Sequence, residues 1–295
     1  MEIRVLQYFL AVVREQSISK AAETLHLTQP TLSRQIHDME EELGHPLFIR
    51  GNRKVILTEE GMILRRRAEE ILSLVQKTEE EIAFSNEIPA GEITIGAGET
   101  RGLKFLAESA NKIHERFPDV SFHIHSGDDE DVLEEMDRGL IDFALLFTAV
   151  DQARYDSMIL PHADSFGVLL RRDSPLAKKG IIEPEDLWKE PLIVSRTALK
   201  RGTISELLRR PAEKLHISAT YSLLYNGSLM VEEGLGCALG FDWIINVSGE
   251  SNLCFRPLSG APEYQVCLIW KKYQEMSKAA GLFLEQLRKD HSSGM

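Results

Sequence analysis

The sequence predicts an α/β protein with an all-α N-terminal domain, and three observations support this fold class. Apolar residues recur at the spacing of amphipathic helices through about the first 43 residues. A seven-residue apolar repeat then runs through about residues 57–82. After Gly91, predicted strands and helices alternate, which indicates sheets covered by helices on both faces. A chain of 295 residues has room for about two domains.

Three helices are predicted in the N-terminal domain. The first covers about residues 3–15 and the second about residues 19–26, each with apolar residues along one face. The third starts near Gln29, where the Thr28 side chain can cap the helix, and Gly44 is placed to end it. Its exposed face begins with polar side chains.

A β-hairpin and a long helix are predicted next. Strands at about 48–49 and 55–57 flank the turn signal Gly51-Asn52, and cations cluster at the tip: Arg50, Arg53 and Lys54. The helix extends from residue 59 to about residue 86. Its apolar seam steps by four and three residues, as in a short coiled coil between two copies of the chain: Leu64, Ala68, Ile71, Val75, Thr78 and Ile82. Packing of this helix against its own domain is the alternative.

The order of the first three helices predicts DNA binding. A helix that follows another after a tight turn, with a polar N-terminal end, is typical of the helix-turn-helix, whose recognition helix contacts base edges in the major groove. Gln29 can pair with adenine, Arg34 with guanine, and Ser33 with a base or a phosphate. The hairpin cations would meet the DNA backbone or the minor groove beside it.

The charge distribution permits DNA binding although the chain carries a net charge of −12. Residues 1–58 hold seven Lys or Arg and seven Asp or Glu, so the excess of acid lies entirely in the rest of the chain. We expect a cytoplasmic protein with no membrane partner, because no apolar segment is long enough to span a bilayer and no signal peptide is predicted.

The segment from Phe9 to Gly61, FLAVVREQSISKAAETLHLTQPTLSRQIHDMEEELGHPLFIRGNRKVILTEEG, resembles the winged helix-turn-helix of LysR-type transcriptional regulators. The likeness is dense over residues 1–65 and looser over the rest of the chain. It implies a C-terminal effector domain of two α/β lobes, similar to periplasmic binding proteins, with a small molecule in the cleft. It also implies pairing through the long helix into a homodimer, often further into a homotetramer.

The resemblance implies three regions with stated bounds. Residues 1–58 form the winged helix-turn-helix, residues 59–88 the linker helix for dimerisation, and residues 89–295 the effector domain. Lobe I covers about 91–161 and 267–295, and lobe II covers about 162–266. Carried over by position, the residues that contact double-stranded operator DNA are Thr28, Gln29, Pro30, Thr31, Ser33, Arg34, Arg50 and Arg53.

The resemblance also implies the effector contacts, which come after the carboxyl ends of strands, where loops and helix N-termini converge. They are Glu99, Thr100, Arg101, Ser126, Gly127, Phe147, Thr148, Ser195, Arg196 and Thr197. Arg101 or Arg196 could pair with an organic anion, but Glu99 could neutralise Arg101 internally, so the charge of the effector stays open. The chain departs from the family pattern at Glu99-Thr100-Arg101 and at Gly240-Phe241, where Leu-Pro is frequent.

Other functions have weaker support in the sequence. An enzyme or a free solute-binding protein would need no recognition helix, and no catalytic residue, cofactor motif or metal site is predicted. His123, His125 and the acids at 128–131 could suggest a metal, but a solvated loop after an edge strand accounts for them. A redox sensor working through Cys237 is a further alternative to a ligand-responsive regulator.

Overall fold

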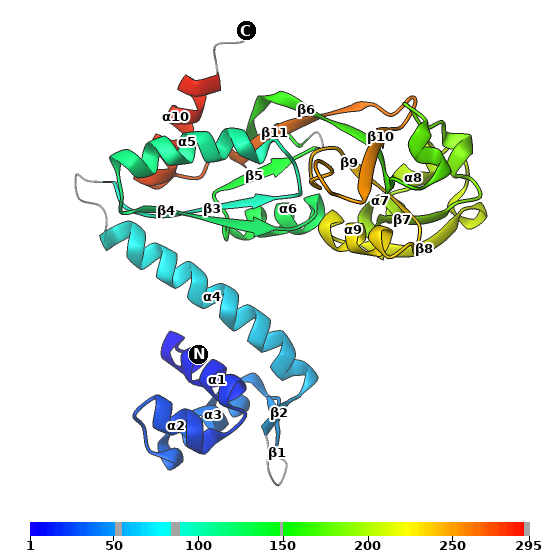
Figure 1. The fold of residues 1–295 in the computed structure, drawn as a ribbon. Coiled ribbons are helices and arrows are strands. Elements are labelled where there is room, and N and C mark those ends of the chain that lie inside the picture. The colour runs from blue at the N-terminus through cyan, green and yellow to red at the C-terminus, as the bar shows by residue number, and fades with distance from the viewer. Residues whose placement is uncertain (51–54, 84–88, 148–149, 292–295) are drawn as a thin grey trace. The chain divides into compact units, whose positions relative to one another are not determined.

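The computed structural model describes residues 1–50, 55–83, 89–147 and 150–291 (Figure 1). Contacts within the chain divide it into two compact units, Met1–Ser85 and Asn86–Met295. Each unit has its own apolar core and is described by itself below.

The first unit contains three helices, a β-hairpin and a long fourth helix (Figure 1). In chain order these are α1 (Ile3–Glu15), α2 (Ile18–Thr24), α3 (Gln29–Leu43), β1 (Phe48–Arg50), β2 (Val55–Leu57) and α4 (Glu59–Ala83). The Thr28 hydroxyl accepts a hydrogen bond from the Thr31 amide at 3.4 Å, which caps α3. Gly44 ends α3 with a φ of 73°, a conformation that costs glycine little. The predicted order of elements is therefore confirmed.

The N-terminal half of α4 packs against the core of its own unit. Ala68 is fully buried there, and Leu64 and Ile71 pack partly against the same core as α1. The chain's own helices thus cover the first part of the predicted coiled-coil seam, because the seam falls on the side of α4 that faces α1. The exposed large apolar side chains of α4 are Met62, Ile63, Leu74 and Ile82.

The second unit is built on a nine-stranded sheet with the order β4-β3-β5-β11-β6-β9-β7-β8, and β10 also pairs with β6. Strands β3, β4 and β5 are mutually parallel, as are β7, β8 and β9, whereas β6, β10 and β11 pair antiparallel to their neighbours. The strands are β3 (Gly91–Ala97), β4 (Val120–Ser126), β5 (Phe143–Leu146), β6 (Tyr155–Arg171), β7 (Pro191–Ser195), β8 (His216–Tyr221), β9 (Cys237–Phe241), β10 (Leu253–Pro257) and β11 (Glu263–Lys271).

Helices cover both faces of this sheet and divide its core. The helices are α5 (Leu103–Arg116), α6 (Asp129–Arg138), α7 (Arg196–Lys200), α8 (Thr203–Leu207), α9 (Leu224–Glu232) and α10 (Lys278–His291), with short 3-10 turns at Pro175–Lys178, Pro184–Leu187 and Ala212–Lys214. Helices α5 and α10 lie together over β3, and α6 lies over β3 and β5. The apolar clusters around β3–β5 and around β7–β9 are separate, so the unit has two lobes.

Strand β6 belongs to both lobes. Its first part pairs with β11, and its last part pairs with β9 and β10. The register of β6 and β11 shifts between Gln265 and Cys267, opposite Pro161. Proline has no backbone donor to lose at such an irregularity. The Gln265 side-chain amide donates to the carbonyl oxygens of Leu160 and His162 at 2.6 and 2.8 Å, which satisfies acceptors that the ladder leaves open.

The structure adds elements that the sequence does not predict. Among them are strands β8 and β10, the first half of β6 and the short helix α7. The first half of β6 contains Pro161, which argues against a strand interior when sequence alone is considered. It is accommodated here at the register shift.

Candidate nucleic-acid interface and ligand cavity

The start of α3 presents a polar, exposed surface. Thr28, Gln29, Pro30, Thr31 and Arg34 are exposed, and Ser33 is half-buried. The apolar face of α3 is turned inward, because Leu32, Ile36 and Met39 are buried in the core of the unit. The predicted contact residues therefore share the solvent side of the helix.

Arg34 is free enough to reach a ligand. Its side chain is 82% exposed, and its Nε lies 3.9 Å from an Asp38 carboxylate oxygen one turn further along α3. Such an exposed ion pair contributes little to stability. Arg34 can therefore leave Asp38 and bind a nucleic-acid base at little cost in free energy. On the hairpin, Arg50 ends β1, while Arg53 and Lys54 lie outside the described residues.

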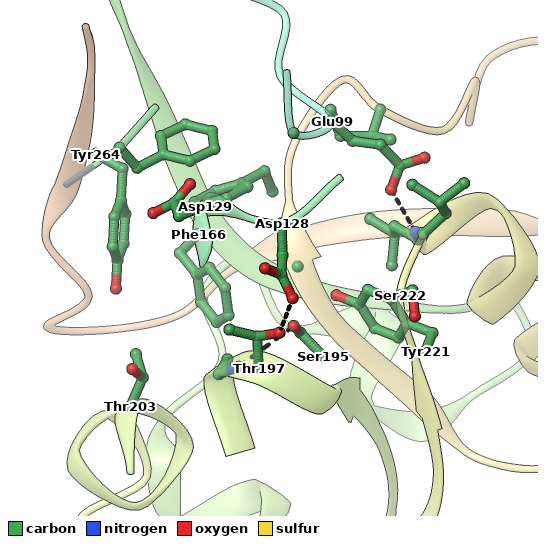
Figure 2. Close-up of a pocket in the computed structure, with 18 of the residues that line it drawn as sticks. Glu99, Asp128, Asp129, Phe166, Ser195, Thr197, Thr203, Tyr221, Ser222 and Tyr264 are labelled. Carbon is green, nitrogen blue, oxygen red and sulfur yellow. Dashed lines mark hydrogen bonds between the residues drawn. The ribbon is translucent and has the colours of Figure 1, made fainter. Parts of the chain in front are cut away.

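A cavity of about 220 Å³ lies between the two lobes of the second unit (Figure 2). Lobe I contributes the ends of β3, β4 and β5, and lobe II contributes α7 and the segments around β8 and β9. The lining residues are Gly98, Glu99, Gly127, Asp128, Asp129, Phe147, Phe166, Ser195, Thr197, Ala198, Arg201, Thr203, Tyr221, Ser222, Leu223, Leu224, Gly240, Phe241, Ile244 and Tyr264. Parallel strands of the two lobes thus direct their carboxyl ends toward one cavity, as α/β proteins do for ligands.

Two hydrogen bonds join the lobes across this cavity, and both are drawn in Figure 2. The Thr197 hydroxyl donates to the Asp128 carboxylate, and the Leu224 amide donates to the Glu99 carboxylate. An ion pair of 3.6 Å joins Arg201 to Asp129. Lobe I supplies the carboxylate in all three contacts.

Asp128 is also the cap of α6. Its side chain accepts hydrogen bonds from the Glu130 and Asp131 amides at 3.0 and 3.1 Å. Burial alone would raise the pKa of Asp128, but hydrogen bonds from Thr197 and these amides, together with the Arg201 charge, lower it. Asp128 therefore faces the cavity as a carboxylate at neutral pH.

Aromatic rings form the opposite wall. Phe241 lies 4.5 Å from Phe147, 5.4 Å from Phe166 and 5.1 Å from Tyr264, measured between ring centroids. In Figure 2, Phe166 and Tyr264 mark this aromatic end, and Glu99 and Ser222 lie at the other. The lining thus combines an aromatic wall, beside which Asp129 lies in Figure 2, with carboxylates that extend across the cavity to Glu99.

The structure brings only part of the predicted effector set to this cavity. Glu99, Gly127, Phe147, Ser195 and Thr197 line it. Thr148 lies outside the described residues.

The remaining predicted residues lie elsewhere. Thr100 is buried, with its hydroxyl directed to Asp164, and Arg196 does not line the cavity. Thr100 follows the strand end but directs its hydroxyl into the protein, and it lines a neighbouring cavity together with Arg101 and Ser126. Ser126 and Arg101 line a second cavity of about 270 Å³, where the Arg101 guanidinium lies 4.1 Å from the centre of the Trp243 ring.

Sequence reasoning missed the acids and the aromatic wall. The sequence places Asp128 and Asp129 in a solvated loop, but both are half-buried and line the cavity. Their position directly after β4 was the available signal, since strand ends converge. Phe166, Phe241 and Tyr264 come from crossing strands, whose pairing the sequence does not predict.

The three cysteines are poorly placed for redox chemistry. Cys237 and Cys254 are buried, and Cys267 is half-buried. Burial raises the pKa of Cys237 to about 12 and also raises the pKa of Cys267, so both thiols stay protonated at neutral pH. The protonated thiol is a weak nucleophile.

These features define a class of protein: a helix-turn-helix unit, joined by a long helix to a two-lobed unit with a ligand cavity. Within the described residues, no helix is both long and apolar enough to cross a membrane. Comparison with known proteins identifies the family within this class.

Two family models match the chain. Residues 3–62 match the bacterial regulatory helix-turn-helix protein of the lysR family, and residues 86–292 match the LysR substrate binding domain. The chain therefore belongs to the LysR family of DNA-binding transcription regulators, a family of regulators rather than enzymes.

Relatives match over most of the chain, and two of them over nearly its whole length. An uncharacterized HTH-type transcriptional regulator of Bacillus subtilis, YvbU, is 28% identical over 98% of both chains. A probable RuBisCO transcriptional regulator of Synechocystis is 28% identical, covering 97% of this chain and 84% of that protein. A hydrogen peroxide-inducible genes activator of Pectobacterium carotovorum is 29% identical over 66% of this chain and 64% of that protein.

Solved structures share the fold. Full-length CbnR in complex with its target DNA superposes with a TM-score of 0.75 at 17% identity, covering 98% of this chain and 99% of that one. A full-length variant of OxyR from Pseudomonas aeruginosa superposes with a TM-score of 0.57 at 24% identity, covering 98% and 95% of the two chains. At these identities the likeness shows the fold.

Proposed function

We propose that this regulator couples a small molecule in the cavity between its lobes to DNA recognition by α3. The observation that carries the proposal is the pair of hydrogen bonds across the cavity, Thr197 to Asp128 and Leu224 to Glu99. A ligand that enters the cavity contacts both lobes, and it either replaces these two hydrogen bonds or adds further contacts to them. It therefore changes the relative free energies of the different orientations that the two lobes can take. A ligand can shift an equilibrium only through such differential contacts.

We propose that the base and phosphate contacts come from the polar start of α3 and from the hairpin. Gln29, Ser33 and Arg34 supply base contacts, and Thr28 and Thr31 lie beside the helix N-terminus, which attracts phosphate. The capping of α3 by Thr28 fixes the end of the helix that would enter the groove.

We propose that α4 pairs two copies through its exposed apolar residues rather than through the first half of the predicted seam. Ile63 and Leu74 are 58% and 37% exposed. They are eleven residues apart, about three helical turns, and therefore share a face. A separate groove of about 620 Å³ lies between α1 and another side of α4, lined by Leu10, Val13 and Leu72 among others.

The proposed effector site consists of the cavity residues, with Glu99, Phe147, Ser195 and Thr197 retained from the sequence prediction. In the sequence, Arg101 and Arg196 could pair with an organic anion, but neither side chain lines this cavity. That ligand class therefore has little support at this site.

Selection of operator DNA with the full-length protein, followed by a titration, tests the proposed function. Duplexes selected from a random library are used to measure affinity with and without a pool of small bacterial metabolites. The active pool should change the affinity of the wild type by about fivefold or more, a usual allosteric coupling. Ser222→Trp fills the cavity and should bind DNA without responding.

Ser248→Trp is the matched control, because Ser248 is exposed in the same lobe and does not line the cavity. It should respond like the wild type. A full response from Ser222→Trp would place the effector outside the cavity and refute the proposal.

A further inference from the structure

We propose that the ligand of the interlobe cavity is a small organic cation, a protonated amine attached to an aromatic or similarly flat apolar body. The inference rests on the proposed function of this cavity and names the chemistry of its ligand. Three features of the lining support it: its charge, the state of the helix ends that face it, and its aromatic wall.

The charge of the lining is negative. Glu99, Asp128 and Asp129 contribute carboxylates, and Arg201 is the one basic residue among the described residues that line the cavity. Arg201 is already paired with Asp129. In a partly desolvated cavity such an excess of acid attracts a cation and repels an anion over several ångströms.

Two helix N-termini at the cavity, those of α6 and α9, are already occupied by the chain's own acids. The first amide of α9, from Leu224, donates to Glu99, and the first amides of α6 donate to Asp128. A helix N-terminus is a common anion site because its amides are unpaired. At α6 and α9 the chain supplies the anion itself, so a ligand carboxylate there would meet a carboxylate of the chain.

The shorter helix α7 is capped as well. The Ser195 hydroxyl accepts a hydrogen bond from the Ala198 amide at 3.3 Å. Hydroxyl groups of Thr203 and Ser222 remain in the lining for hydrogen bonds to the ligand. They serve neutral and charged ligands alike and do not offset the acidic charge.

The aromatic wall suits the rest of a cation. Phe147, Phe166, Phe241 and Tyr264 line one end of the cavity, with neighbouring ring centroids 4.5 to 5.9 Å apart. Ring faces attract ammonium groups and also pack against flat apolar groups. A ligand with a charged end toward Glu99 or Asp128 and an apolar body toward these rings matches both parts of the lining.

Three probes that share one ring test the inference on the full-length protein. Benzylammonium, benzyl alcohol and benzoate are similar in size and differ in charge. Calorimetry and thermal unfolding at millimolar concentration should rank benzylammonium first and benzoate last. Benzylammonium should bind about tenfold or more tightly than benzoate, because the two probes carry opposite charges and the lining has more acidic than basic groups.

Glu99→Gln keeps the shape of the acceptor but removes its charge, and should reduce the preference for benzylammonium severalfold. Glu115→Gln, on the exposed side of α5, is the matched control and should leave the preference unchanged. Benzoate binding as tightly as benzylammonium, no binding of benzylammonium, or an unchanged preference in Glu99→Gln each overturns the inference.

Ser222→Trp separates this inference from the proposed function. If benzoate is preferred and Ser222→Trp abolishes its binding, the cavity is the ligand site and only the charge class is wrong. If benzylammonium binds Ser222→Trp as well as it binds the wild type, the cavity is not the site, and both proposals fail.

Discussion

The hydroxyl of Thr100 donates a hydrogen bond to the carboxylate of Asp164, which is 1% exposed on the strand that both lobes share. His162 Nε2 lies 2.8 Å from the other carboxylate oxygen of Asp164. The same Thr100 hydroxyl accepts from the Gly102 amide at 2.9 Å, at the start of α5. Thr100 therefore ties the first loop of lobe I to the crossing between the lobes.

Thr100→Val should destabilise the second unit and leave ligand selectivity intact. The substitution removes a donor from a buried carboxylate, which costs about 1–3 kcal/mol. Urea unfolding followed by circular dichroism measures the loss. Thr203→Val, at a half-buried cavity position, is the comparison and should cost less. Equal stability of Thr100→Val and the wild type would mean that another donor replaces the hydroxyl.

Arg34→Ala should weaken binding to selected DNA by about 1–3 kcal/mol, the contribution of one good base contact, and relax the preference at one position of each half-site. Fluorescence anisotropy with a panel of single-base variants measures both effects. Arg4→Ala, at a 68% exposed side chain on α1, is the control and should preserve sequence preference. An unaltered preference profile in Arg34→Ala would remove Arg34 from the base contacts.

Ile63→Asp with Leu74→Asp should dissociate the oligomer and keep the first unit folded. Both side chains are exposed within one chain, so the new charges are buried only if a second copy covers them. Sedimentation velocity measures the size, and circular dichroism checks the fold. Ala68→Asp should instead unfold the unit, since Ala68 is fully buried. A double variant of wild-type size would place the interface elsewhere.

The carboxylate of Asp290 should make the second unit sensitive to acid. Burial would raise the pKa of Asp290, but hydrogen bonds from Lys112, Ser109 and Gln286 lower it to about 2. These bonds join α10 to α5 at 2.6 Å and 2.7 Å, through Lys112 and Ser109. Because the pKa falls on folding, the stabilisation is complete above the unfolded pKa of about 3.9 and is lost as pH falls toward 2.

Asp290→Asn should therefore lower the free energy of unfolding at pH 7 by about 1–2 kcal/mol, and the difference from the wild type should shrink between about pH 4 and pH 2. Chemical denaturation across this range measures it. Glu115→Gln, an exposed change on the same helix α5, should show no such trend. A difference that is constant with pH would assign the loss to packing and not to charge.

Hydrogen peroxide should leave DNA binding unchanged. Because burial raises the pKa of Cys237 to about 12, its thiolate is scarce at neutral pH and oxidation is slow. Mass spectrometry after peroxide treatment should find the three thiols unmodified while the protein is folded. Rapid oxidation of Cys237 with a loss of DNA binding would instead support a redox sensor.

The N-terminal unit could be predicted closely because its signals are local. The cap Thr28, the apolar stripe from Leu32 to Met39 and the terminal Gly44 lie within one helix and its ends. The direction in which the α4 seam faces depends on packing against α1. The heptad pattern of α4 fits packing against a partner chain and packing against the chain's own α1 equally well. The burial of Ala68 in the core of the first unit shows that the first turns of α4 pack against the chain's own helices.

The cavity was predictable only in part, for a related reason. Strand ends could be located, so Glu99 and Ser195 were expected at the site. The direction of a side chain just beyond a strand depends on long-range contacts, as Thr100 shows by turning to Asp164, 64 residues away. Phe241 and Tyr264 reach the cavity through strand pairings that local periodicity does not encode.

Because β6 runs without interruption from one lobe into the other, the lobes cannot be exchanged as separate modules. A cut near residue 161 would leave each half of the strand without its continuation, and the returning strand β11 would lose the neighbours that fix its register. Chimaeras that recombine ligand-sensing specificities should therefore transfer residues 91–291 as one piece. Chimaeras joined at the sequence positions where one lobe gives way to the other should have unpaired strand edges and should aggregate.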